Sequence, residues 1–183
     1  ALRLKFLADL LTTRGQLDSA TGLWNHTFFE SRLAEEISLS KRTGRPLSCL
    51  VLKLANLQRL NEQHGQPVSA HVFAHFAGIV GANIRQEDVA CRTGPDEVSL
   101  ILPNTPIGGA LAQADRLHRS LVSTAIDSAG GRVAINVTIG AAQWNDTDAR
   151  KLHAIARSAI QSMPPVAARK ARAATSAPQQ RVA

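Results

Sequence analysis

Two short stretches of the chain carry side chains that are well suited to bind a ligand. Arg85 and Asp88 are three residues apart, and Asp96 and Glu97 are adjacent carboxylates further along the chain. A guanidinium can donate a forked pair of hydrogen bonds to a guanine edge or a phosphate, and a carboxylate can accept from N–H groups. Both stretches also have plain structural interpretations, as a surface ion pair at a helix end and as the polar tip of a hairpin.

Other reactive side chains do not form a recognisable site. His71 and His75 are four residues apart, as in a zinc-binding helix, but the metalloprotease glutamate is missing and no third ligand is evident. We therefore expect two ordinary helix histidines and no metal. Cys49 and Cys91 both lie in strand-like segments, so we expect buried thiols rather than a disulfide.

The pattern of apolar residues predicts the elements that hold these side chains. Short apolar runs indicate strands at residues 47–54, 89–92, 98–102 and 133–142. A first helix is expected to begin at a cap on Asn25 or Thr27 and to end at Gly44. Helical spacing indicates further helices at residues 55–64, 68–84, 107–122 and 149–162. The predicted fold is an α/β sandwich with a mainly antiparallel central sheet covered by helices.

The two ends of the chain differ from its centre. Residues 1–17 carry leucines at roughly helical spacing, either the end of a signalling coiled coil from an upstream domain or a helix packed on its own domain. The chain begins inside this apolar segment, so we expect a fragment of something longer. We expect a folded domain over residues 18–163 and a mostly disordered, basic, Pro/Ala-rich tail over residues 164–183.

The net charge of +7 does not indicate a nucleic-acid partner. Four of the 21 basic residues and none of the 14 acidic residues lie in the tail, so residues 1–163 carry only +3. No apolar run approaches the roughly 20 residues of a membrane helix, and two cysteines cannot stabilise a secreted scaffold. We expect a cytoplasmic domain, which could be the cytoplasmic part of a membrane-attached protein.

Four blocks of sequence, in order and correctly spaced, resemble the GGDEF domains, the family of the diguanylate cyclases. TGLWN at 21–25 resembles the entry motif, and NLQRLNEQHG at 56–65 resembles the stretch after the first strand. RTGPDEV at 92–98 resembles the signature hairpin, and VTIGAA at 137–142 a later strand. The resemblance implies a palm-like βααββαβ core. It also implies a reaction in which two facing domains, each holding one GTP, form cyclic di-GMP.

Several positions depart from the catalytic pattern that this resemblance implies. Lys53 stands where the family has its first metal-binding aspartate, and Gln58 where it has a phosphate-contacting lysine. Ala70 replaces an aspartate that contacts guanine, although Asn61, the partner of that aspartate, is kept. Phosphoryl transfer needs Mg²⁺ and cationic groups around the phosphates.

The signature hairpin is also altered. Gly94, Asp96 and Glu97 match the family, but Pro95 replaces the second glycine and removes a backbone N–H. We therefore expect a degenerate active site with no catalytic residue, no metal and no cofactor.

A second site of the family is matched at every position. Its product-binding inhibitory site is an RxxD motif five residues before the signature, where this chain has Arg85 and Asp88. Arg116 falls at the position of a second arginine on the helix after the hairpin. The resemblance therefore implies a cyclic di-GMP site at Arg85, Asp88 and Arg116.

We expect a catalytically inactive GGDEF domain that acts as a cyclic di-GMP receptor at the output end of a bacterial signalling protein. Expected partners are a second copy, bridged by ligand or not, an upstream sensory or regulatory domain, and an unidentified protein. Three alternatives stay open. They are a dimerisation or docking module that binds no nucleotide, a regulatory domain that binds GTP without turnover, and a weak enzyme.

Overall fold

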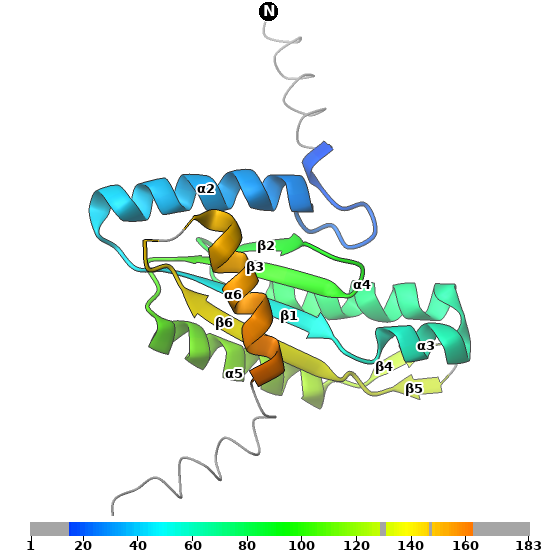
Figure 1. The fold of residues 1–183 in the computed structure, drawn as a ribbon. Helices are drawn as coiled ribbons and strands as arrows, with labels where there is room; N and C mark the ends of the chain where they lie inside the picture. Colours follow the sequence, from blue (N-terminus) through cyan, green and yellow to red (C-terminus); the bar gives the residue numbers. More distant parts are fainter. Residues whose placement is uncertain (1–14, 129–130, 147, 163–183) are drawn as a thin grey trace, which may run out of the picture.

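The computed structural model describes residues 15–128, 131–146 and 148–162. Most of the leucine-rich segment and the whole basic tail lie outside the described residues. The described elements are, in chain order, α2 His26–Thr43, β1 Leu47–Leu54, α3 Leu57–His64, α4 Gln66–Ala82, β2 Val89–Arg92, β3 Glu97–Pro103, α5 Ile107–Ser123, β4 Ile126–Ser128, β5 Gly131–Val133, β6 Val137–Gln143 and α6 Ala149–Ser162 (Figure 1). Within the described ranges, no helix combines the length and the hydrophobicity needed to cross a membrane.

The central sheet is antiparallel and has the strand order β2-β3-β1-β6. Successive side chains of a strand point to opposite faces, so each strand contributes to two cores. Leu50 and Leu52 of β1 pack with α3, α4 and α5. Cys49 and Val51 pack with α2 and α6 on the other face. Figure 1 shows these two helical layers on either side of the sheet, which confirms the predicted α/β sandwich.

The helix ends follow their local sequence. Asn25 is the N-cap of α2, since its Oδ1 accepts a hydrogen bond from the Phe28 N–H at 3.0 Å. Gly44 closes the same helix with a left-handed φ of 69°. At the other end of the chain, α6 lies close to β6 because Gly140 has no side chain, and a Cβ there would overlap the Ala156 carbonyl oxygen.

The predicted strand at 133–142 is wrong in its first part. β4 and β5 form a separate two-stranded sheet, and β6 begins only at Val137. Between β5 and β6, the side chain of Asn56, which follows β1, forms hydrogen bonds with the backbone of residues 134–136. Its Nδ2 donates to the Ala134 carbonyl at 3.0 Å, and its Oδ1 accepts from the Asn136 N–H at 3.1 Å. The alternating apolar residues continue through this break, so the sequence pattern did not show it.

Candidate functional site

The tip of the β2–β3 hairpin is held by Arg92. Its Nε donates to the Gly94 carbonyl and its Nη2 to the Pro95 carbonyl, both at 3.2 Å. Its Nη1 lies 3.3 Å from both carboxylate oxygens of Asp18. The backbone N–H of Gly94 donates to the Glu97 carbonyl at 3.4 Å. Since Pro95 has no N–H, the tip presents little free donor capacity to an anion.

Lys53, at the end of β1, reaches this tip. Its Nζ lies 3.3 Å from Oδ2 of Asp96, and both side chains are partly exposed. An ammonium at this distance neutralises the carboxylate and repels a second cation. The donor set therefore does not fit Mg²⁺, because a cation, the Lys53 ammonium, already faces the Asp96 carboxylate.

Glu97 follows Asp96 in the sequence but binds on the other side of the hairpin, against α6. Its two oxygens accept from Nε and Nη2 of Arg157 at 2.9 and 2.6 Å, and Thr93 Oγ1 donates to it at 2.7 Å. Burial raises the pKa of Glu97, but the hydrogen bonds from Arg157 and Thr93 outweigh burial and hold the pKa below its ordinary value. Glu97 is therefore an ionised carboxylate with donors on both of its oxygens.

His153 completes this buried cluster. Its Nε2 lies 2.9 Å from Ser99 Oγ and 3.6 Å from Glu97 Oε1. Burial, followed by the nearby charge of Arg157, lowers the pKa of His153 to about 4. The imidazole is therefore neutral at pH 7, and its contact with Glu97 is not an ion pair there.

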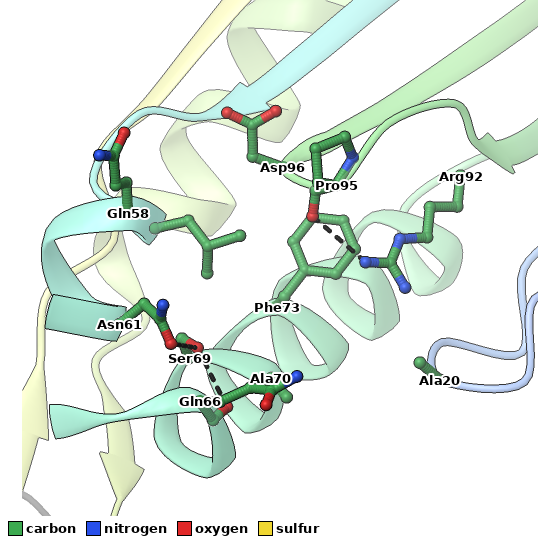
Figure 2. Close-up of a pocket in the computed structure, with 11 residues that line it drawn as sticks. Ala20, Gln58, Asn61, Gln66, Ser69, Ala70, Phe73, Arg92, Pro95 and Asp96 are labelled. Carbon is green, nitrogen blue, oxygen red and sulfur yellow. Dashed lines mark hydrogen bonds between the residues drawn. The ribbon is translucent and has the colours of Figure 1, made fainter.

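A cavity of about 480 Å³ opens between the hairpin tip, α3 and α4 (Figure 2). The lining includes five positions expected from the sequence: Gln58, Asn61, Ala70, Pro95 and Asp96. Lys53, Gly94 and Glu97 do not line it. In Figure 2, Gln58 and Asn61 lie on the α3 side of the cavity, and Pro95 and Asp96 lie at the hairpin tip.

The polar groups of this cavity are largely committed to each other. Asn61 Oδ1 accepts from Ser69 Oγ at 3.1 Å, and Gln58 Nε2 donates to Glu62 at 3.0 Å. The Arg92 guanidinium lies over the Phe73 ring at 4.6 Å. Sequence reasoning missed Ser69 and Phe73 as lining residues, because both were assigned only to a helix.

Arg85 and Asp88 lie just after α4, and Arg116 on α5 reaches the end of α4 through Asn83. Asp88 is 7% exposed, and its Oδ2 accepts from the Arg85 backbone N–H at 3.0 Å and from Gln113 Nε2 at 2.8 Å. Gln113 precedes Arg116 by one helical turn, and Arg116 Nη2 donates to the Asn83 carbonyl at 3.1 Å. Sequence reasoning missed Gln113, because no local pattern connects it to Asp88.

The plain structural interpretation of these residues, a surface ion pair between Arg85 and Asp88, is not what the geometry shows. Asp88 contacts the backbone of Arg85, whereas the exposed Arg85 guanidinium makes no hydrogen bond or ion pair within the described part of the chain. Two donors thus hold the Asp88 carboxylate, and the side-chain N–H groups of Arg85 stay unused among the described residues. The three predicted residues share one edge of the domain.

The remaining candidates have structural roles. Cys49 and Cys91 are free and buried, which confirms the predicted thiols, and burial raises the pKa of Cys91 to about 12. The rings of His71 and His75 are 6.0 Å apart on α4. In the described ranges, no group of three or more His, Cys, Asp or Glu residues could hold a metal ion.

Comparisons with known proteins agree with this fold. Residues 15–172 match the family model described as "Diguanylate cyclase, GGDEF domain". The response regulator PleD of Caulobacter vibrioides is 30% identical over 122 residues, which are 67% of this chain and 27% of PleD. Diguanylate cyclase DosC of Escherichia coli is 27% identical over 180 residues, covering 87% of this chain and 39% of DosC. The chain thus spans less than half the length of these relatives.

A solved structure shows the same architecture. The GGDEF domain of DgcB from Caulobacter crescentus, in complex with c-di-GMP, superposes with a TM-score of 0.77 at 19% identity. The match covers 81% of this chain and 86% of the DgcB chain. The family model covers most of the chain and the sheet order and hairpin are in place, so the chain belongs to the GGDEF family, the diguanylate cyclase domain family.

Proposed function

We propose that this domain does not synthesise cyclic di-GMP and instead binds it as a receptor in cytoplasmic signalling. The observation that carries the first half is the 3.3 Å contact between Lys53 Nζ and Asp96 Oδ2. This contact supports the proposal, because a cation beside Asp96 would stand in for the Mg²⁺ that phosphoryl transfer needs. Glu97 cannot take over, because Arg157 and Thr93 use both of its oxygens.

The receptor site is proposed at Arg85, Asp88 and Arg116. The Arg85 side chain is exposed and its donors are unused within the described ranges. Arg116 donates one hydrogen bond from Nη2 to the Asn83 backbone carbonyl. Forked arginine donors suit guanine O6 and N7 or phosphate, and a fixed carboxylate suits guanine N–H groups. Calorimetry with cyclic di-GMP, together with a turnover assay with GTP and Mg²⁺, tests the two halves separately.

Ligand-dependent self-association is a further part of this proposal. One cyclic di-GMP carries two guanines, so a surface site with two arginines can contribute to a bridge between two copies of the domain. We expect weak dimerisation that strengthens with ligand in sedimentation-velocity experiments. A strict monomer at saturating ligand would contradict bridging while leaving binding intact.

A second candidate is GTP binding without turnover. The observation that favours it is the 480 Å³ cavity, which keeps Asn61 and falls within the size range of ligand pockets. Equilibrium dialysis with radiolabelled GTP distinguishes the two candidates. Binding that Asn61→Ala removes and Arg85→Ala does not would support this second function.

A further inference from the structure

A second cavity, of about 350 Å³, lies between α2 and α6 on the other helical layer. Its inner wall is apolar, since Phe29 and Leu33 are almost fully buried there. Three alanines, Ala34, Ala149 and Ala154, also line the cavity, and their short side chains leave the space unfilled. The volume lies within the range of small-molecule pockets, roughly 300–1,000 Å³. No part of the proposed receptor function uses this cavity.

The polar lining of the cavity is mainly basic. It comprises one acid, Glu30, and four basic or titratable side chains, His26, Arg150, His153 and Arg157. Glu30 is partly engaged, because His26 Nε2 lies 3.8 Å from its carboxylate. Arg150 is exposed and has no hydrogen bond or ion pair with the residues that the structure describes. Arg157 is half-exposed and uses only Nε and Nη2 for Glu97, so Nη1 can still donate.

This combination of an apolar wall and free guanidinium donors selects a particular ligand chemistry. Apolar surface favours an aryl or alkyl group, and an arginine at the rim favours a carboxylate or phosphate. We propose that the α2–α6 cavity binds a small apolar anion, such as an aryl or short-chain acid, with its charge toward Arg150 and Arg157. The ligand would then share Arg157 with the Glu97 carboxylate of the signature hairpin.

The test is a ¹H–¹⁵N NMR titration of the whole chain with 1-naphthoate, its neutral analogue 1-naphthamide, and acetate. We expect 1-naphthoate to shift amides of α2 and α6 with sub-millimolar affinity. We expect the neutral analogue to bind about fivefold or more weakly, and acetate alone not to bind measurably. No amide shift with 1-naphthoate up to several millimolar, or equal affinity for 1-naphthoate and 1-naphthamide, would overturn the proposal.

Two variants locate the site. Arg150→Glu should weaken 1-naphthoate about fivefold or more, because it reverses the free charge at the rim. Ala154→Phe should remove binding, because it fills the space between the helices from an exposed position. Arg59→Glu on α3 makes the same charge change outside the cavity and should have no effect. Arg85→Ala should also leave naphthoate binding unchanged, which separates this cavity from the proposed receptor site. If Arg59→Glu weakens binding as much as Arg150→Glu, the cavity is not the site.

Discussion

The Lys53 ammonium lies 3.3 Å from the Asp96 carboxylate, at the tip of the family's signature hairpin. On the proposed function, this pair would close the position from which a carboxylate would hold a divalent cation. Glu97, the next residue, turns to the other side of the hairpin and forms two hydrogen bonds with Arg157 on α6. Asp96 and Glu97 are adjacent in the sequence but form two separate ion pairs in the fold, with Lys53 and with Arg157.

The first prediction concerns turnover. The chain should form no cyclic di-GMP from GTP with Mg²⁺ or Mn²⁺, as measured by chromatography of the reaction products. Lys53→Asp alone should not restore activity, because Gln58, Ala70 and Pro95 also lack the required groups and such groups act as a unit. Product formation by the unmodified chain that disappears in Glu97→Ala would show that the hairpin is catalytic after all.

The second prediction concerns the bond between Glu97 and Arg157. Arg157→Ala leaves a buried carboxylate without its main donors, at a cost of about 1–2 kcal/mol in the free energy of unfolding, given that Arg157 is half-exposed. The matched control is Arg150→Ala on the same helix, which should cost less than about 0.5 kcal/mol. Urea unfolding measures both. Equal costs would mean that the bond contributes nothing to stability.

The third prediction concerns pH and His153. The pKa of His153 is about 4 in the folded chain, where burial disfavours the charged form, and about 6.5 for an ordinary histidine. The unfolded chain therefore takes up a proton in this window that the folded chain does not. The free energy of unfolding must therefore fall as the pH falls, and His153 alone should remove about 2 kcal/mol between pH 7 and pH 5. Glu97 also has a lowered pKa, so it removes stability in the same direction as the pH falls, but its contribution is kept throughout this range and is lost only in stronger acid.

Urea unfolding at pH 7, 6 and 5 measures this pH dependence of the free energy of unfolding. His153→Gln should have a flatter pH dependence, whereas His64→Gln on exposed α3 should behave like the unmodified chain. A pH dependence that is the same in all three proteins would show that His153 does not titrate as its burial requires.

Local patterns in the sequence predict much of this fold. The bounds of β1 and β2 follow from apolar runs, and those of α6 from the helical spacing of apolar residues. The start of α2 follows from Asn25, because its short polar side chain caps the first turn of the helix. The β4–β5 hairpin could not be predicted, since Val133, Ile135 and Val137 keep an alternating pattern while Asn56 binds the backbone between them.

The site is less predictable than the fold, because its contacts join distant segments. Glu97 and Arg157 are 60 positions apart, and they meet only because α6 packs closely over Gly140. Asp88 and Gln113 are 25 positions apart and meet through the packing of α5. The resemblance to the family pointed to Arg85, Asp88 and Arg116, but only tertiary structure brings Gln113, which donates to Asp88 beside the local Arg85 N–H.

The most direct test of the receptor proposal is isothermal titration calorimetry with cyclic di-GMP on the unmodified chain, Arg85→Ala and Asp96→Ala. We expect micromolar or better affinity for the unmodified chain, about −8 kcal/mol. Arg85→Ala should weaken it about ten- to hundredfold, since a forked charged donor is worth roughly 1.5–3 kcal/mol. Asp96→Ala should bind as tightly as the unmodified chain, because Asp96 belongs to the hairpin site. Equal affinities for the unmodified chain and Arg85→Ala, or a loss confined to Asp96→Ala, would contradict a receptor site at Arg85.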